Sequence, residues 1–348
     1  MTDTSSFDYE LPEALIAQRP AASREAARLL VLQPEAIEHR VVSDLALLVP
    51  EDALVVLNST RVRRARLFGR RVRSEGRVEL LLLDPVLGSE KWRALGKANR
   101  PLKPGDEIRA GDLGIVVEEK AEDGVLTVRL ESSAPLDEAL VKDGLLPLPP
   151  YIRRAPDGAD DERYQTVFAR ELGSVAAPTA GLHLSRELLA RLEARGVELG
   201  FLTLHVGVGT FRPLSSERLE DHVMHEERIQ VGVELAEQVR RARRAGRPVV
   251  AVGTTVVRTL ESVVALTGEM REYTGSTRLF ITPGYQFRVV DALLTNFHMP
   301  KSTLLALVAA FAGYELMMSG YRTAVEQRYR FLSYGDAMWI PRCYGSTI

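Results

Sequence analysis

The segment 294–303 gathers the side chains of this chain that are best suited to chemistry. It reads Leu-Thr-Asn-Phe-His-Met-Pro-Lys-Ser-Thr and runs straight into an apolar stretch. This pattern predicts the end of a buried strand, a polar loop and the start of a helix. Open α/β sheets bind ligands at such strand-to-helix transitions. The segment therefore predicts a binding or catalytic loop, whose polar members are Asn296, His298, Lys301, Ser302 and Thr303.

Histidine is unusually concentrated in the second half of the chain, where five of the six histidines lie between positions 183 and 298. His183, His205 and His298 each fall in a loop rich in Gly, Thr or Asn at the boundary of an expected strand or helix. The imidazole group titrates near neutrality and is the usual general acid or base. These three are our acid/base candidates, and a structural or surface role is the alternative for each.

The segment 252–258, Val-Gly-Thr-Thr-Val-Val-Arg, is typical of a strand, a glycine turn and a helix N-terminus. Free backbone N–H groups at such a terminus favour a carboxylate or phosphate. Thr254 and Thr255 could instead be ordinary helix caps. The same two readings apply to Ser302 and Thr303, although the neighbouring Lys301 favours an anion.

Two further polar groupings leave alternatives open. Gly207 and Gly209, with Thr210, would let a ligand approach the backbone closely, or they mark a β-bulge. His222 and His225 have a spacing that can bind a metal. They lack the His-Glu-x-x-His arrangement, so a substrate hydrogen bond or a structural role is favoured and no metal is expected.

Charge is balanced overall but clustered locally. The formal net charge is −2, so the overall charge of the molecule does not indicate nucleic-acid binding. The segment 61–73 nevertheless holds seven arginines and no acidic residue, and 240–247 holds five more arginines. We expect the first cluster to contact phosphates through arginines on one strand face. The alternative for both clusters is that the arginines are simply solvated surface charges. For the second cluster we give this alternative equal weight.

Composition places the chain in an ordinary globular class. It has 348 residues, 45% of them hydrophobic and 26% charged, which is enough for two domains. The single cysteine, Cys343, excludes an internal disulfide and a cysteine-based zinc site. No secretory signal and no stretch of membrane-spanning length is visible. These features indicate a cytoplasmic chain.

The order of expected elements indicates a discontinuous domain. Short strands at 28–32 and 53–57 are followed, from 63 to 150, by alternating runs separated by Gly and Pro turns, without a long helix. This middle part predicts a small β-barrel or sandwich, and from 151 the α/β alternation returns. We therefore expect a layered α/β sandwich domain (1–62 and 151–348) with an inserted β-barrel domain (63–150). The expected helices after 151 are 185–195, 235–245, 255–266, 302–312 and 322–330, and the expected strands are 200–205, 248–252, 277–281 and 292–297.

Familiar ligand motifs are missing from the sequence. It has no phosphate loop of the Gly-x-x-x-x-Gly-Lys-Ser/Thr type, no Gly-x-Gly-x-x-Gly dinucleotide loop and no Gly-x-Ser-x-Gly nucleophile elbow. Residue chemistry alone thus predicts an α/β enzyme with a polar site lined by His and Thr, and a basic accessory domain. It does not predict which reaction the enzyme catalyses.

Taken together, the motifs resemble one family closely, the S-adenosylmethionine:tRNA ribosyltransferase-isomerases of queuosine biosynthesis. The most specific segments are Ala-Ala-Pro-Thr-Ala-Gly-Leu-His (176–183), Thr-Leu-His-Val-Gly-Val-Gly-Thr-Phe-Arg-Pro (203–213) and Leu-Thr-Asn-Phe-His (294–298). Leu184, Glu25 and Ala27 depart from the usual pattern, and the tail after Ile340 looks additional. The other matching segments are 7–12, 57–62, 146–153, 163–167, 222–225, 251–255, 258–261, 283–285, 300–305 and 329–338.

The resemblance implies a reaction and its partners. The ribosyl part of S-adenosylmethionine is transferred and isomerised onto 7-aminomethyl-7-deazaguanine in the anticodon wobble position of tRNA. Epoxyqueuosine-tRNA forms, and adenine and methionine leave. S-adenosylmethionine is then a co-substrate and no true cofactor is expected, nor a metal, a membrane or an oligomer.

The same resemblance, joined to residue chemistry, assigns candidate residues. The catalytic candidates are His183, His205 and His298. The tRNA-binding candidates are Arg63, Arg64, Arg66 and Arg71. The substrate-binding candidates are Asn58, Arg61, Thr179, Gly207, Gly209, Thr210, His225, Thr254, Thr255, Arg258, Asn296, Lys301, Ser302 and Thr303.

Three other functions remain open at this level. An S-adenosylmethionine-dependent RNA methyltransferase shares both ligands, but the usual glycine-rich loop after its first strand is absent. A non-catalytic RNA-binding module would not need so many His, Thr and Asn loops. A metallohydrolase that uses the histidines is the third, and chelators would inhibit it.

Overall fold

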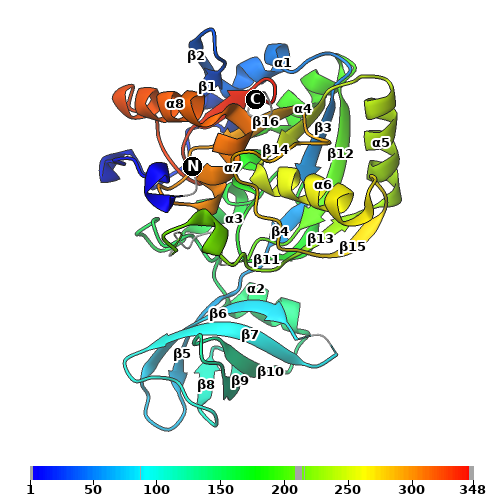
Figure 1. Cartoon of the computed structure of the whole chain (residues 1–348). Helices are drawn as coiled ribbons and strands as arrows, with labels where there is room; N and C mark the ends of the chain where they lie inside the picture. The colour runs from blue at the N-terminus through cyan, green and yellow to red at the C-terminus, as the bar shows by residue number, and fades with distance from the viewer. Residues whose placement is uncertain (1–2, 87, 208–213, 215, 345–348) are drawn as a thin grey trace.

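The computed structural model describes residues 3–86, 88–207, 214 and 216–344. Gly209 and Thr210, two of the expected substrate-binding residues, lie outside the described residues, as does the end of the tail after Ile340. Figure 1 shows two bodies, a large α/β part and a smaller β-barrel set apart below it. The expected fold class, a layered α/β domain with an inserted β-barrel, is therefore confirmed.

The large part is built on a mixed nine-stranded sheet in the order β15-β13-β12-β3-β14-β16-β17-β1-β2. The central strands β12, β3, β14 and β16 are parallel to one another, whereas β17 runs antiparallel to β16. The strands are β1 (Arg28–Leu32), β2 (Ile37–Val41), β3 (Leu54–Asn58), β12 (Glu198–Leu204), β13 (Glu227–Val231), β14 (Val249–Val252), β15 (Tyr273–Thr277), β16 (Ala292–Asn296) and β17 (Ala337–Ile340).

Helices cover both faces of this sheet because its central strands are apolar on both sides. In β3, Val55 and Leu57 pack with α4 on one face, whereas Leu54 and Val56 pack with α5 and α6 on the other. The result is a three-layer sandwich with two cores. The helices of this domain are α1 (Leu45–Leu48), α3 (Gly158–Arg163), α4 (Arg186–Glu193), α5 (Val233–Arg244), α6 (Thr254–Thr267), α7 (Thr303–Ala312) and α8 (Tyr314–Glu326).

Two expected elements are placed differently in the structure. The strand expected at 277–281 ends at Thr277, because β15 pairs with β13 only from Tyr273 to Thr277. The helix expected at 322–330 begins at Tyr314, directly after Gly313, and ends at Glu326. Arg328 has a φ of 54°, so the helix cannot continue through it. The other helices and strands expected after 151 are confirmed, with ends shifted by one or two residues.

The barrel closes on itself in the strand order β10-β7-β6-β5-β8-β9. Its inward side chains alternate along each strand, as with Leu80 and Leu82, or Ile115 and Val117, and form a separate core. One short helix that we did not expect, α2 (Leu136–Asp143), packs Ala139 and Leu140 on this core. The strands are β5 (Arg66–Arg71), β6 (Arg77–Pro85), β7 (Lys91–Ala98), β8 (Glu107–Ala110), β9 (Leu113–Lys120) and β10 (Leu126–Glu131).

The chain enters and leaves the barrel side by side. Arg66 N–H donates to the carbonyl of Leu145 at 3.1 Å, and Leu145 N–H donates back at 2.8 Å. A small parallel pair, β4 (Thr60–Val62) with β11 (Glu171–Ser174), lies at this junction on the side of the large domain. Both connections are thus held by backbone hydrogen bonds.

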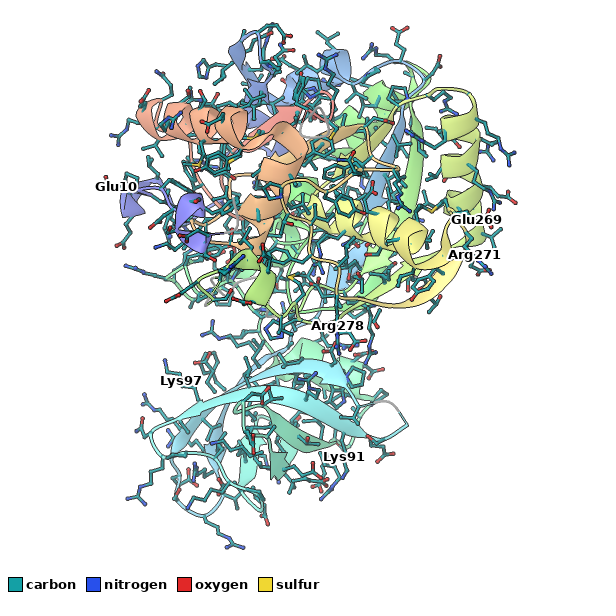
Figure 2. All side chains as sticks on the ribbon, viewed as in Figure 1. Glu10, Lys91, Lys97, Glu269, Arg271 and Arg278 are labelled. Carbon is teal, nitrogen blue, oxygen red and sulfur yellow. The ribbon has the colours of Figure 1, made fainter. Side chains whose placement is uncertain are left out.

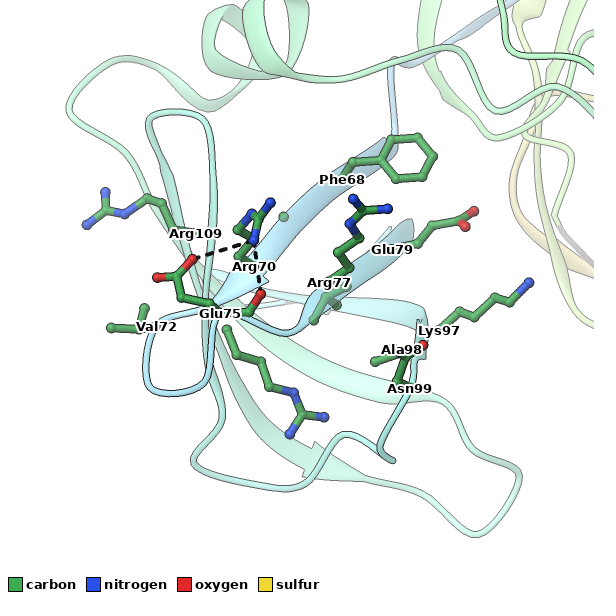
Figure 3. A pocket seen from close by; sticks show the side chains of 13 residues that line it. Phe68, Arg70, Val72, Glu75, Arg77, Glu79, Lys97, Ala98, Asn99 and Arg109 are labelled. Carbon is green, nitrogen blue, oxygen red and sulfur yellow. Dashed lines mark hydrogen bonds and ion pairs between the residues drawn. The ribbon is translucent and has the colours of Figure 1, made fainter.

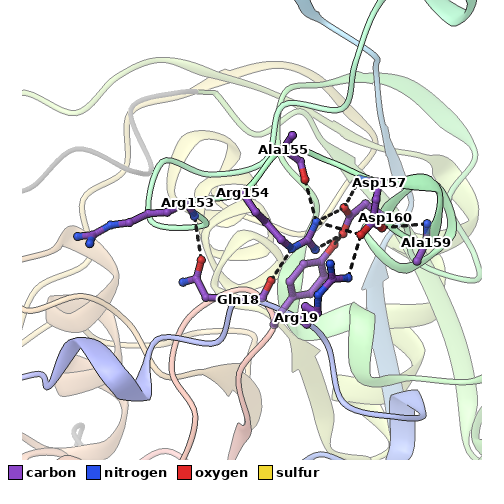
Figure 4. Close-up of polar contacts among 9 residues, drawn as sticks. Gln18, Arg19, Arg153, Arg154, Ala155, Asp157, Ala159 and Asp160 are labelled. Carbon is purple, nitrogen blue, oxygen red and sulfur yellow. Dashed lines mark hydrogen bonds and ion pairs between the residues drawn. The ribbon is translucent and has the colours of Figure 1, made fainter.

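A buried polar cluster fixes the return segment after the barrel to the N-terminal segment (Figure 4). The Arg154 guanidinium donates two hydrogen bonds to Asp160, at 2.6 and 2.7 Å, and a third to the carbonyl of Gln18 at 2.9 Å. Tyr334 donates to the same carboxylate at 2.7 Å. Burial would raise the pKa of Asp160, but these donors together lower it to about 2.

No single helix in the described part of the chain is long and apolar enough to cross a membrane. Only α7 and α8 taken together reach that length and composition, and they are bent by 116° at the break between them.

The contribution of Asp160 to the free energy of unfolding should depend on pH. Its folded pKa of about 2 lies below the ordinary 3.8, so the contribution is present above pH about 4 and is lost as pH falls through 2. Asp160→Asn should lower the free energy of unfolding by about 3 kcal/mol, because Arg154 loses its buried partner. Denaturant unfolding at pH 7 and pH 3 measures this.

The control is Asp161→Asn on the same helix, whose carboxylate pairs with Arg64 at 2.6 Å but is 46% exposed. An exposed pair contributes about 0–1 kcal/mol. Equal losses for the two variants would contradict the role given to Asp160.

Candidate active site

A cavity of 320 Å³ lies where the parallel strands of the sheet end. The carboxyl ends of β12, β14 and β16 all point to this edge, and each is followed by a loop that contributes to the wall. The size falls in the lower part of the range of small-molecule sites. The polar side chains in its wall are those of Tyr151, Thr179, Thr254, Thr255, Thr295, Asn296, His298, Ser302 and Ser333.

The loop before α6 contributes two of these groups. Gly253 has a φ of 95° and a ψ of 151°, a conformation open essentially to glycine alone. It lets the chain leave β14 and enter α6 within one residue, which places Thr254 and Thr255 at the wall of the cavity. The two threonines were expected here from the sequence, at a helix N-terminus that favours an anion.

Asn58, at the end of β3, is buried and fully engaged within the protein. Its Nδ2 donates to the Leu204 carbonyl at 3.0 Å and to Thr255 Oγ1 at 3.3 Å. Its Oδ1 accepts from the N–H groups of Thr60 and Leu204, both at 3.1 Å. Asn58 holds Thr255 in place through this hydrogen bond, but it does not itself line the cavity. Its predicted substrate contact stays a prediction.

His298 is the one acid/base candidate in the wall of the cavity. Its Nε2 lies 2.9 Å from Thr295 Oγ1, and its backbone is held by Tyr321 and Tyr9. Burial lowers the pKa of the imidazole from 6.5 to about 3. The ring is therefore neutral near pH 7, and its predicted acid/base role stays a prediction.

His183 does not line this cavity, but it contacts Asn296, which does. The Asn296 Nδ2 is 3.2 Å from His183 Nε2 and donates to the Leu332 carbonyl at 3.0 Å. Burial, with the nearby positive charge of Arg330, lowers the pKa of His183 to about 4. An amide donor on Nε2 occupies the lone pair that a base would use. His183 thus contacts Asn296, whose Oδ1 is buried without a partner among the described residues, and its predicted catalytic role stays a prediction.

His205 faces the junction with the barrel and does not line the cavity. Its Nδ1 lies 2.9 Å from Thr60 Oγ1, and its ring packs on Gly173 so closely that a Cβ there would come within 2.6 Å. Burial lowers its pKa, helped by the positive charge of Arg228. The three histidines expected to share one site are therefore divided among three surroundings.

The loop before α7 separates three residues that we expected to act together. Ser302 lines the cavity and caps α7, accepting from Leu305 N–H at 3.2 Å. Lys301 turns away, with a φ of 51° and its ammonium 2.6 Å from Asp8. Thr303 points to a second, smaller cavity. An anion site at Lys301 is thus already occupied by an aspartate of the chain.

The second cavity adjoins the first through Leu304 and has a charged wall. Arg258 forms a buried ion pair with Glu227. Arg258 Nε donates to the Leu279 carbonyl at 3.1 Å, and Nη2 is buried without a partner among the described residues. Gly207, His225 and Thr303, all expected to bind substrate, also line this cavity.

Tyr151 and Ser333 are wall residues that we did not predict. Their hydroxyl oxygens are 2.7 Å apart, and burial raises the pKa of Tyr151 to about 12. Both stand in segments that carry the family resemblance, 146–153 and 329–338. Only the tertiary fold brings the exit from the barrel next to the segment before β17.

The arginines expected to contact tRNA are engaged with carboxylates of the chain itself. Arg64 and Arg66 approach Asp161 and Glu79 at 2.6 Å each. Arg63 and Arg71 approach Asp137 and Asp106 at 3.4 Å each. The Arg63 guanidinium also stacks on Trp92, 4.8 Å from the ring centroid. Phosphate contact by these four stays a prediction, and so does that by the exposed Arg61.

The described residues contain no group of three or more His, Cys, Asp or Glu side chains that could hold a metal ion. His222 stacks edge-on against Phe280, with ring centroids 5.5 Å apart.

Fold and cavity together define an α/β enzyme class that has a small-molecule site at the carboxyl edge of a mixed sheet and an inserted β-barrel. Comparison with known proteins gives the family. Residues 4–340 match the family model described as "Queuosine biosynthesis protein", and the chain belongs to that family. It is a transferase-isomerase.

Similar proteins carry one name. The S-adenosylmethionine:tRNA ribosyltransferase-isomerase of Sorangium cellulosum is 51% identical, over 96% of this chain and 97% of its own. That of Xylella fastidiosa strain M23 is 53% identical, over 99% of both. A crystal structure of the S-adenosylmethionine tRNA ribosyltransferase from Thermotoga maritima matches with a TM-score of 0.56 and 37% identity, over 97% of this chain and 100% of that one.

The neutral histidines should make folding sensitive to mild acid. Unfolding restores an ordinary pKa of 6.5, so between that value and the folded values of about 3 and 4 the unfolded state binds more protons. Stability should fall by about 3 kcal/mol per histidine as pH drops from 6.5 to 4. The double variant His183→Gln with His298→Gln should flatten this dependence, measured by denaturant unfolding across that range.

The matched control is His39→Gln on the outer strand β2, where the residue is exposed and its Nδ1 lies 2.8 Å from the Tyr329 hydroxyl. It should keep the wild-type slope. A double variant whose stability still falls as steeply as that of the wild type would exclude the two histidines as the source.

Proposed function

We propose that this chain transfers and isomerises the ribosyl moiety of S-adenosylmethionine onto 7-aminomethyl-7-deazaguanine at the wobble position of a tRNA anticodon. The products are epoxyqueuosine-tRNA, adenine and methionine. The observation that supports this best is the cavity at the carboxyl edge of the sheet, walled by hydroxyl, amide and neutral imidazole groups, in a chain of this family.

The reaction needs groups that such a wall can supply. The sulfonium acidifies the neighbouring 5′ carbon, so a base must take a proton there. The departing adenine must gain a proton, and the attacking amine must be neutral. His298 is the proposed acid/base group, because it is the one histidine candidate whose side chain lines the cavity.

The amino-acid end of S-adenosylmethionine needs an anion site. In this proposal the N-terminus of α6, with Thr254 and Thr255, takes the carboxylate. The adjoining cavity of Arg258 and Thr303 is the other position for it. The chain then works without a true cofactor and without a metal, with S-adenosylmethionine as co-substrate.

The other predicted residues take supporting roles. His183 orients Asn296, and His205 stands by the junction of the two domains, where the tRNA would enter. The partner is a tRNA that already carries the 7-aminomethyl-7-deazaguanine base. The protein acts as a cytoplasmic monomer in this proposal.

Incubation with S-adenosylmethionine and tRNA bearing the modified base should release free adenine. Adenine that appears only with the modified tRNA supports ribosyl transfer. S-adenosylhomocysteine in place of adenine would identify a methyltransferase instead. If neither product forms, a binding module becomes the better description.

His298→Ala should lower kcat by about 10²–10⁴-fold, the usual contribution of a general acid or base. Binding of S-adenosylmethionine, measured by calorimetry, should change only a few-fold. His39→Gln serves as the control with wild-type turnover. Intact turnover by His298→Ala would remove this residue from the mechanism.

A further inference from the structure

The outer face of the barrel carries a hollow of 810 Å³ that lies outside the cavity of the active site. Figure 3 shows the side chains that line it on neighbouring strands of the barrel, with Arg70 next to Glu75. Five of the lining residues are cationic and two are acidic. The cationic residues are Arg70, Arg71, Arg77, Lys97 and Arg109.

Strand register brings three of these arginines into one row. Arg70 of β5 is directly opposite Arg77 of β6 on one side and Arg109 of β8 on the other. Cross-strand neighbours lie about 5 Å apart, and like charges directly opposite one another are destabilising. A folded barrel thus keeps three guanidinium groups in mutual repulsion across three adjacent strands.

The barrel backbone is also unusually close at this row. A Cβ on Gly69 would lie 2.6 Å from the carbonyl oxygen of Arg109. Only glycine allows β5 and β8 to approach in this way. A side chain at position 69 would therefore disturb the pairing of β5 with β8 beside Arg70 and Arg109.

Neutralisation within the chain distinguishes this row from the arginines next to it. Arg63, Arg64, Arg66 and Arg71 each have a carboxylate within 3.4 Å. In contrast, the exposed side chains of Arg77, Lys97 and Arg109 make no hydrogen bond or ion pair with any described residue.

Arg70 has a loose partner in Glu75. The Arg70 Nη1 lies 3.8 Å from the carboxylate, which is 74% exposed, and donates to the Glu75 carbonyl at 3.3 Å. Arg109 interacts with Asp112 at longer range. The positive charge of the row is therefore less compensated by close carboxylates than that of the arginines next to it.

An exposed aromatic side chain stands beside the row. Phe68, two residues before Arg70 on the same face of β5, is 53% exposed. Lys97 pairs in register with Glu79, which is itself opposite Phe68. Cationic groups beside an exposed aromatic ring are the combination with which proteins bind RNA backbone and unstacked bases.

We propose that this face, defined by Phe68, Arg70, Arg77, Lys97 and Arg109, binds the sugar-phosphate backbone of the tRNA substrate at a distance from the reacting base. The assignment to tRNA rests on the proposed function. Three strands place the guanidinium groups across about 10 Å, so they contact more than one phosphate of the same RNA. Figure 2 shows Lys97 on the barrel, separate from the labelled charged residues of the α/β domain.

The test replaces the row and leaves the catalytic cavity unchanged. The triple variant Arg70→Gln, Arg77→Gln, Arg109→Gln should raise KM for the modified tRNA about 10- to 100-fold at 0.15 M salt. Its kcat and its affinity for S-adenosylmethionine should remain within twofold of wild type. Filter binding of an unmodified tRNA transcript gives the slope of the logarithm of the association constant against the logarithm of the salt concentration. This negative slope should become shallower by about 2–3.

The charge-matched control removes three arginines from α5 in the other domain, Arg240→Gln, Arg241→Gln and Arg244→Gln. It should leave KM and the salt slope near wild type. The thermal midpoint separates binding from misfolding. Removal of repelling charges should leave the midpoint of the barrel triple variant equal or higher, whereas an unfolded barrel would lower it.

A single change tests the aromatic part of the face. Phe68→Ala should weaken transcript binding about threefold to tenfold, and Phe68→Tyr should restore it, because stacking survives in tyrosine.

Two results would overturn the proposal. One is an unchanged KM and salt slope in the barrel triple variant, and the other is an equal loss in the α5 control, which would reduce the effect to net charge. Failure of the proposed function is separate. It would appear as no adenine release by the wild-type protein, whereas transcript binding would still report on this face.

Discussion

The amide of one asparagine holds together the edge of the sheet on which the site depends. Parallel strands β3 and β12 stop pairing at Asn58, because the chain beyond it turns towards the barrel. Backbone groups would otherwise be left unpaired in the interior, at a cost of about 1–3 kcal/mol each. Asn58 instead accepts from two N–H groups and donates to a carbonyl and to the Thr255 hydroxyl. The start of α6 and the ends of two strands thereby share one anchor.

Burial then sets the chemical character of that cavity. The pKa values of His298 and His183 both lie well below the ordinary pKa of imidazole, and in each case burial is the main cause. Their surroundings nevertheless differ. The cavity wall exposes His298 to a ligand, whereas Asn296 lies between His183 and the cavity. Similar pKa shifts therefore occur at two different positions relative to the cavity.

The layered sheet, the barrel and the converging loops could be predicted because each depends on local patterning. An apolar run such as Val-Val-Ala-Val before Gly253 predicts a strand and its end. Polar residues after Asn296 likewise mark the end of a strand, and both signals can be read wherever they occur in the chain. The partners of charged groups could not be predicted in this way. Arg63 stacks on Trp92, Lys301 meets Asp8, and Tyr151 meets Ser333 only because segments distant in sequence become neighbours in the fold. The resemblance to the family supplied the reaction, which residue patterns alone did not.

The place of the barrel in the chain also has a consequence for folding. β3 and β12 lie next to each other in the sheet, yet 139 residues separate Asn58 from Glu198. Pairing across so long a segment is entropically costly and slow. The barrel strands, in contrast, are close in sequence and bury a core of their own. A barrel that forms first brings Arg66 and Leu145 together and so shortens the loop that β3 and β12 must close. An inserted domain that folds around its own core thereby lowers the entropic cost of pairing the two strands that flank it.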